Sequence, residues 1–135
     1  MCHKLHVAQQ SKMDPDFVII ARTDAIGAEG FDMAIKMAKA YEEAGADMIF
    51  VEAPVSVEQI KIIASEIKIP KLLNMFHSGK TPIMKVDELQ NLGYNVIIIP
   101  SDLQRASIKA MQNSLSAIKL TGNSSSIADD MVSFK

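Results

Sequence analysis

Guanidinium, carboxylate and amide side chains stand at the ends of four apolar runs in this 135-residue chain. They are Arg22 and Asp24 at the first run, Glu52 at the second, Asn74 at the third, and Arg105 one helical turn after the fourth. A guanidinium binds a carboxylate or phosphate through two parallel hydrogen bonds. The set therefore indicates an oxygen-rich anionic substrate, unless these residues are only the polar ends that strands have where they meet loops.

The four apolar runs predict short parallel strands. They cover Phe17–Ala21, Met48–Val51, Leu72–Met75 and Val96–Ile99, and they are rich in β-branched residues and leucine. Such nearly continuous apolar runs are typical of strands buried on both faces. Because the carboxyl ends of parallel strands open on the same side of a sheet, we expect the polar residues at these ends to converge on one site.

In the segments between the runs, apolar residues recur at the spacing of a helix. The predicted helices cover residues 31–44, 56–67, 86–92 and 103–120, and the first dozen residues resemble the end of a further helix that enters the pattern. Ser56 and Gln59 have the spacing of a capping box, which marks a helix start. Each strand is thus followed by a helix, which predicts an α/β fold of four parallel βα units.

Two architectures accept four such units, an open doubly wound sheet and one half of an eight-stranded TIM-type barrel. The sequence contains no GxGxxG or GxxxxGK[ST] motif, so the phosphate-binding open sheet loses support. We therefore expect residues 1–122 to form a half-barrel preceded by the end of an entering helix. Residues 123–135 are expected to form a polar linker and a C-terminal segment.

The composition excludes several functional classes. With 48% apolar and 22% charged residues the chain is expected to fold around a core, and a net charge of −2 offers no basic surface for nucleic acid. No apolar stretch reaches the 18 or so residues of a membrane span. Cys2 is the only cysteine, which fits a reducing compartment, so we expect a cytoplasmic protein.

Four segments together resemble the isocitrate lyase and phosphoenolpyruvate mutase superfamily. They are FVIIARTDA at 17–25, GADMIFVEAP at 45–54, NMFHSGKTP at 74–82 and IPSDLQR at 99–105. The resemblance runs from about residue 14 to the end of the chain and covers the C-terminal half of the family's eight-stranded barrel. It is strongest to the methylisocitrate lyase, dimethylmalate lyase and carboxyphosphonoenolpyruvate mutase-like branches.

The resemblance implies an activity and a set of site residues. The activity is an Mg²⁺-dependent carbon–carbon bond lyase or mutase that acts on a small 2-hydroxy or 2-oxo di- or tricarboxylate through an enolate-like intermediate. The implied substrate-binding residues are Arg22, Asn74, Met75, Phe76 and Arg105, and the implied catalytic residue is Glu52. Asp24 is either the partner that holds Arg22 in place or an ordinary loop acid.

The sequence departs from the family in three places. The paired metal-binding aspartates lie on the first four strands of the family barrel, which have no counterpart here, so we expect Mg²⁺ in the complete enzyme and no direct metal ligand in this chain. The segment Phe76-His77-Ser78 replaces a loop rich in glutamate and glycine, and Phe134 stands where the lyase branch has an arginine. Both changes leave the substrate open. Lys80 is interpreted as a solvated loop lysine rather than an anion contact.

Two other functions remain open. The first is a catalytically incomplete half-barrel that associates with itself or with a complementary N-terminal half and at most binds a carboxylate. Four strands leave two open edges and an uncovered inner face, which such pairing would protect. The second is a nucleotide-binding protein with an open sheet. A chain that binds no nucleotide would exclude this function.

Overall fold

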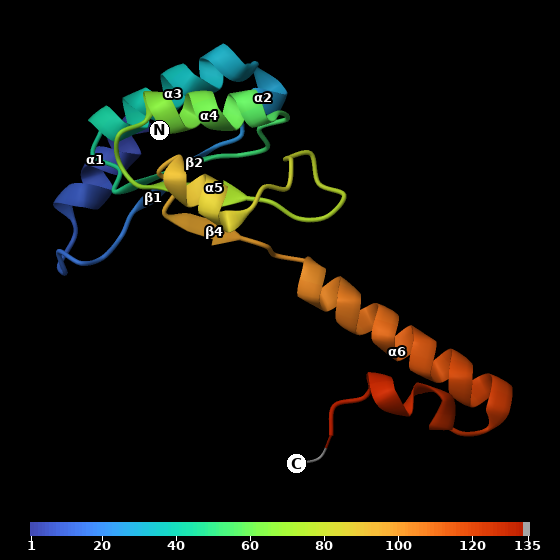
Figure 1. The fold of residues 1–135 in the computed structure, drawn as a ribbon. Coiled ribbons are helices and arrows are strands. Elements are labelled where there is room, and N and C mark those ends of the chain that lie inside the picture. The colour runs from blue at the N-terminus through green and yellow to red at the C-terminus, as the bar shows by residue number, and fades with distance from the viewer. Residues whose placement is uncertain (134–135) are drawn as a thin grey trace. The chain divides into compact units, whose positions relative to one another are not determined.

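The protein, described here by a computed structural model of residues 1–133, forms two compact units (Figure 1). The first unit comprises residues 1–100 and the second begins at Ser101. The expectation for Phe134 lies outside the described residues.

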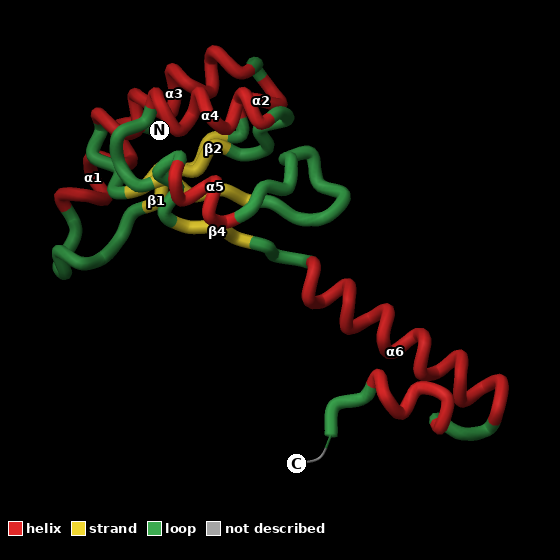
Figure 2. The backbone as a smooth tube through the Cα atoms, viewed as in Figure 1, coloured by secondary structure: helices red, strands yellow, loops and turns green. Residues whose placement is uncertain are grey.

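Strands and helices alternate along the first unit (Figure 2). The strands are β1 (Ile20–Thr23), β2 (Met48–Val51), β3 (Lys71–Asn74) and β4 (Val96–Ile98). The helices are α1 (Cys2–Gln10), α2 (Ala25–Ala28), α3 (Phe31–Glu43), α4 (Val57–Glu66) and α5 (Val86–Asn91). The capping expected before α4 is present, because the Ser56 hydroxyl accepts a hydrogen bond from the backbone N–H of Gln59 at 3.1 Å.

The sheet has the order β1-β2-β3-β4, and all its strands are parallel. Ala21, Ile49 and Leu73 share one core with buried residues of α1, α3, α4 and α5, so these helices cover one face of the sheet. A doubly wound sheet reverses its strand order and carries helices on both faces. The observed order confirms the prediction of four parallel βα units of the barrel type.

The other face of the sheet carries the side chains that alternate with this core. They include Arg22, Phe50 and Leu72, which lie side by side on neighbouring strands. The predicted first strand, Phe17–Ala21, is wrong in its bounds because β1 begins only at Ile20. Phe17 and Val18 are 64% and 52% exposed, so this part of the apolar run precedes the strand instead of forming it.

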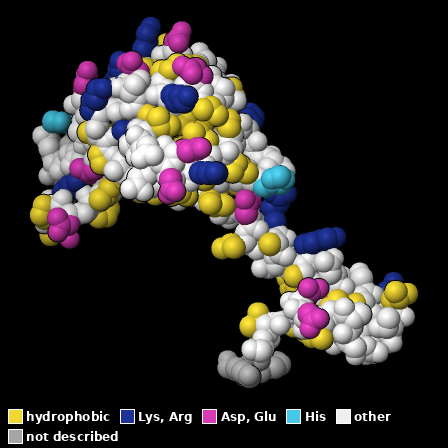
Figure 3. Space-filling model, viewed as in Figure 1, with side chains coloured by type: hydrophobic (Ala, Val, Ile, Leu, Met, Phe, Trp, Pro, Cys, Tyr) yellow, Lys and Arg dark blue, Asp and Glu magenta, His cyan; other side chains and the backbone are white. Residues whose placement is uncertain are grey.

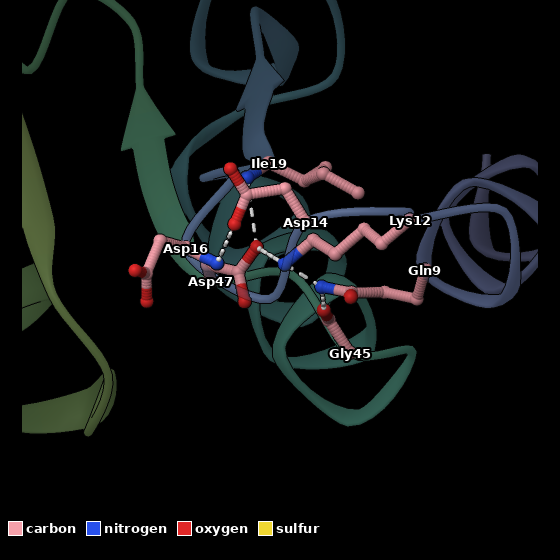
Figure 4. Close-up of polar contacts among 7 residues, drawn as sticks. All are labelled: Gln9, Lys12, Asp14, Asp16, Ile19, Gly45 and Asp47. Atoms are coloured by element: carbon pink, nitrogen blue, oxygen red, sulfur yellow. Dashed lines mark hydrogen bonds and ion pairs between the residues drawn. The ribbon is translucent and has the colours of Figure 1, made fainter.

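Asp47, in the turn before β2, ties the end of α1 to the sheet (Figure 4). Its Oδ2 accepts hydrogen bonds from Lys12 Nζ at 2.6 Å, from the Ile19 backbone N–H at 2.7 Å and from Gln9 Nε2 at 3.1 Å. Gln9 Nε2 also donates to the Gly45 carbonyl. Burial raises the pKa of the Asp47 carboxyl, but these donors outweigh it, so the pKa lies below its ordinary value of 3.8.

Replacing Asp47 by asparagine is expected to lower the free energy of unfolding by roughly 1 kcal/mol at neutral pH, because a charged hydrogen-bond acceptor becomes neutral. The folded-state pKa of Asp47 lies below the unfolded value. Its contribution is therefore present above the unfolded value of 3.8 and is lost as the pH falls through the folded-state pKa. Urea denaturation at neutral and at strongly acidic pH should show a difference between wild type and Asp47→Asn that shrinks in acid.

Asp16→Asn is the control for this experiment. The Asp16 residue is exposed, and its side chain makes no hydrogen bond within the described part of the chain. This variant should unfold like the wild type at both pH values. If the free energies of unfolding of wild type and Asp47→Asn differed by the same amount at neutral and acidic pH, the stabilisation would not depend on ionised Asp47.

The second unit consists of α6 (Asp102–Thr121), which ends at the left-handed Gly122, and a 3₁₀ helix at Ser125–Asp130. No residue of α6 is buried, and several large apolar side chains of the helix are exposed (Figure 3). None of the described helices is long and apolar enough to cross a bilayer. The units divide after Pro100, whereas the sequence suggested a boundary at residue 122, so the assignment of residues 101–122 to the half-barrel stays a prediction.

Candidate functional site

Arg22 is held by two carboxylates at the carboxyl ends of β1 and β2. Its Nε lies 3.0 Å from Asp24 Oδ2 and its Nη2 lies 2.7 Å from Asp24 Oδ1, a two-pronged ion pair. The same Nη2 lies 3.3 Å from Glu52 Oε2. Asp24 follows the last residue of β1 and Glu52 the last residue of β2, so the ends of these two strands meet at one place. This is part of the convergence that the sequence predicted for four strand ends.

The sheet register explains why these groups meet. Arg22 pairs in register with Phe50, and its guanidinium lies 4.9 Å from the centre of the Phe50 ring. A cation over an aromatic face gains about 0.5–1 kcal/mol at an exposed site. Alternate residues of a strand share a face, so Glu52 follows Phe50 on the side of Arg22. From β3, Asn74 Nδ2 donates to Glu52 Oε1 at 3.4 Å.

The charged groups of this site stabilise one another's ionised forms. The hydrogen bond to Asp24 raises the pKa of the Arg22 guanidinium against an opposing effect of burial, and the charge of Glu52 adds to the rise. The same hydrogen bond lowers the pKa of the Asp24 carboxyl. Both groups are therefore ionised at neutral pH.

A cavity of about 460 Å³ opens beside Arg22. Its described lining residues are Arg22, Asp24, Gly27, Glu52, Ala53, Phe76, Ser78, Gly79, Lys80 and Thr81. Ala53 has φ 57° and Ser78 has φ 70°, and among the described residues they are the only ones other than glycine with a positive φ. Such strained conformations cluster at functional sites. The strain thus marks the same cavity as the charges do.

A larger hollow of about 610 Å³ lies along residues 8–20, before and at the start of β1. Its lining is mainly apolar and includes Met13, Phe17 and Val18. Although it is larger, it lacks the convergent arginine and carboxylates of the cavity beside Arg22. We therefore place the candidate site at Arg22.

The other residues singled out in the sequence lie in different places. Phe76 lines the cavity, whereas Met75 is buried in the core between the sheet and the helices. Arg105 lies in α6, in the second unit, where its Nη1 is 3.9 Å from Asp102 Oδ1. The substrate-binding roles of these residues stay predictions.

The structure adds residues that the sequence analysis did not single out for the site. Phe50 was detectable, because it stands two positions before Glu52 and strand alternation places both on one face. Ala53 and Ser78 were not detectable, since nothing in the sequence signals a positive φ there. Lys80 lines the cavity, and this position could not be inferred from its being a lysine in a loop.

The carboxylates of this site lie against the Arg22 guanidinium. Mg²⁺ prefers octahedral oxygen ligands, including carboxylates. Both oxygens of Asp24 accept hydrogen bonds from Arg22, and Glu52 faces the same guanidinium and Asn74. No group of three or more histidine, cysteine, aspartate or glutamate residues able to hold a metal occurs in residues 1–133.

The chain is similar to known lyases along most of its length. The family model for phosphoenolpyruvate phosphomutase matches residues 1–119. Identity with 2,3-dimethylmalate lyase of Eubacterium barkeri is 40% over 134 residues, which are 99% of this chain and 46% of that protein. Identity with 2-methylisocitrate lyase of Aeropyrum pernix is 44% over 116 residues, 86% of this chain and 38% of that protein. The chain thus spans less than half the length of these relatives.

Solved structures show the same fold. Crystalline 2,3-dimethylmalate lyase, described as a PEP mutase/isocitrate lyase superfamily member, superposes with a TM-score of 0.83 and 28% identity over 97% of this chain and 44% of that one. Phosphonopyruvate hydrolase, crystallised with oxalate and Mg²⁺, gives a TM-score of 0.78 and 25% identity over 98% of this chain and 48% of that one. These superpositions support the half-barrel topology of the sheet.

Proposed function

The chain belongs to the phosphoenolpyruvate phosphomutase family, and from this membership we propose that it supplies the carboxylate-binding part of a carbon–carbon bond lyase. The substrate is a small 2-hydroxy or 2-oxo di- or tricarboxylate, and the reaction passes through an enolate-like anion. The relatives named as lyases of 2,3-dimethylmalate and 2-methylisocitrate support a substrate of this class.

Glu52 carries the proposal. Its Oε2 is buried, lies 3.3 Å from Arg22 Nη2 and has no hydrogen-bond donor among the described residues. A buried carboxylate oxygen without a donor is costly, so a donor on the substrate would satisfy it. Glu52 therefore accepts the proton or hydrogen bond of the substrate 2-hydroxyl, while Arg22 binds an adjacent carboxylate.

We assign the metal of the complete enzyme to residues outside this chain. A family neighbour was crystallised with Mg²⁺, and both carboxylate oxygens of Asp24 already accept hydrogen bonds from Arg22. Arg105 is proposed to bind substrate as well.

Binding and turnover test this proposal separately. Calorimetry should show that the chain binds oxalate, and NMR should show cleavage of 2,3-dimethylmalate or 2-methylisocitrate only when Mg²⁺ and a separately produced N-terminal half of 2,3-dimethylmalate lyase are added. Glu52→Gln should keep oxalate binding but lower turnover at least about 100-fold, as expected for loss of a group that acts in proton transfer. A folded wild-type chain that does not bind oxalate would refute the proposal.

Association without turnover is the second candidate function. It is supported by the exposed apolar side chains beside the open edge of β1, where Val18 and Ile20 are 52% and 46% exposed. The partner would be a second copy of the chain or a complementary N-terminal half, either of which would cover this edge. Light scattering on the samples used for the turnover assay decides between the two candidates, since stable association with persistent inactivity favours the second.

A further inference from the structure

We propose that Lys80 is the second cationic group of the site cavity and that it selects ligands with two carboxylates over ligands with one. This inference rests on the proposed function, because it assumes that a small carboxylate binds beside Arg22. Lys80, in the loop between β3 and α5, would then determine how many carboxylates the preferred ligand carries.

The charges of the residues that line the cavity favour a second cation beside Arg22. The charged residues among its described lining are Arg22, Asp24, Glu52 and Lys80. Without Lys80 the site would hold one positive and two negative charges and would repel a dianion. Asp24 also occupies the Nε and Nη2 edge of the guanidinium, so Arg22 cannot use that edge to bind a ligand. Lys80 is the other cationic residue among the described residues that line this cavity, so it is placed to bind a second carboxylate.

The loop around Lys80 has a fixed backbone although the lysine itself is exposed. The Gly79 backbone N–H donates to the Phe76 carbonyl at 3.0 Å, and a Cβ added at Gly79 would lie 3.1 Å from that oxygen and from the Phe76 ring. Ser78 holds a positive φ in the same turn. Thr81, on the other side of Lys80, is buried. These contacts hold the lysine backbone at the cavity, so less conformational freedom is lost when it binds a ligand.

Lys85 offers a matched control. It lies on the same loop, immediately before α5, and it is exposed like Lys80. It is not among the described residues that line the cavity. The two lysines therefore contribute equally to the net charge of the protein but differently to the charge of the site.

Calorimetry at low ionic strength with oxalate and glycolate tests the proposal, because these ligands are similar in size and carry two carboxylates and one, respectively. Lys80→Met should raise the oxalate Kd about 3- to 5-fold, the upper part of the range for one exposed charge. It should raise the glycolate Kd less than about 2-fold. Lys80→Arg should restore oxalate binding, and Lys85→Met should leave it unchanged. Gly79→Ala should weaken oxalate binding with every charge still present, because the turn must shift.

The outcomes separate the two proposals. If Arg22→Met abolishes oxalate binding and Lys80→Met does not weaken it, the role of Lys80 is refuted and the proposed function stands. Equal weakening of oxalate and glycolate by Lys80→Met, or equal effects of Lys80→Met and Lys85→Met, would also refute it. If the folded wild-type chain binds no oxalate, both proposals fail.

Discussion

Arg22→Met is expected to weaken oxalate binding by at least about 30-fold. The substitution removes the guanidinium but keeps an apolar stem over the Phe50 ring, so the fold should be preserved. It leaves Asp24 and Glu52 without their shared counter-ion, and two negative charges then face an anionic ligand. Truncating one partner of a buried charge pair costs about 2–5 kcal/mol of binding free energy, and about 1.4 kcal/mol corresponds to tenfold in Kd. Because the Arg22 side chain is half exposed, the lower end of this range applies.

Arg22→Lys separates charge from geometry in this prediction. Lysine restores one positive charge but cannot form the two-pronged contact that Arg22 makes with Asp24. We expect an oxalate Kd roughly tenfold above the wild-type value, between those of wild type and Arg22→Met. Calorimetry measures the affinities, and circular dichroism checks that each variant is folded. An Arg22→Met protein that bound oxalate within about 3-fold of the wild type would contradict the assignment of the site.

Leu73→Ala is expected to lower the free energy of unfolding by about 2–5 kcal/mol. Leu73 is 1% exposed, pairs in register with Ile97 and belongs to the core between the sheet and the helices. Its truncation removes buried apolar contacts and leaves a cavity that rigid strands cannot close. Because a domain has only about 5–15 kcal/mol of stability, this change could unfold much of the population near body temperature.

Ile20→Ala provides the comparison on the same sheet. Ile20 lies on β1, on the face away from the helices, and is 46% exposed. We expect Ile20→Ala to cost less than about 1 kcal/mol, since nearly half of the Ile20 surface already contacts water. Urea denaturation followed by circular dichroism measures both variants. Equal losses would mean that the uncovered face is packed as tightly as the covered one.

The fold was largely predictable because strands and helices leave periodic signals. The apolar runs located β2, β3 and β4, and the capping pair located the start of α4. The limits of β1 were not predictable, because an apolar run does not show whether a neighbouring strand lies beside it, and Phe17 has none. The short helix Ala25–Ala28 was missed, since four residues are too few to show a helical period.

The candidate site was predictable where it depends on strand ends and not where it depends on loops. Parallel pairing alone brings Arg22, Asp24 and Glu52 together. Strand alternation also shows why Met75 belongs to the core, because it follows Asn74, which faces Glu52. The turn that brings Lys80 to the cavity is built from hydrogen bonds, packing and a positive φ that have no signature in the order of residues.

The consecutive strand order has a consequence for biosynthesis. Among the described strands each one pairs with the next one made, so β1, β2 and β3 each gain a partner soon after synthesis. The sheet can therefore grow by one βα unit at a time during translation, and folding in this order involves only short loop closures. Each new strand covers the edge left by the one before it, and β4 remains as an edge of the described sheet.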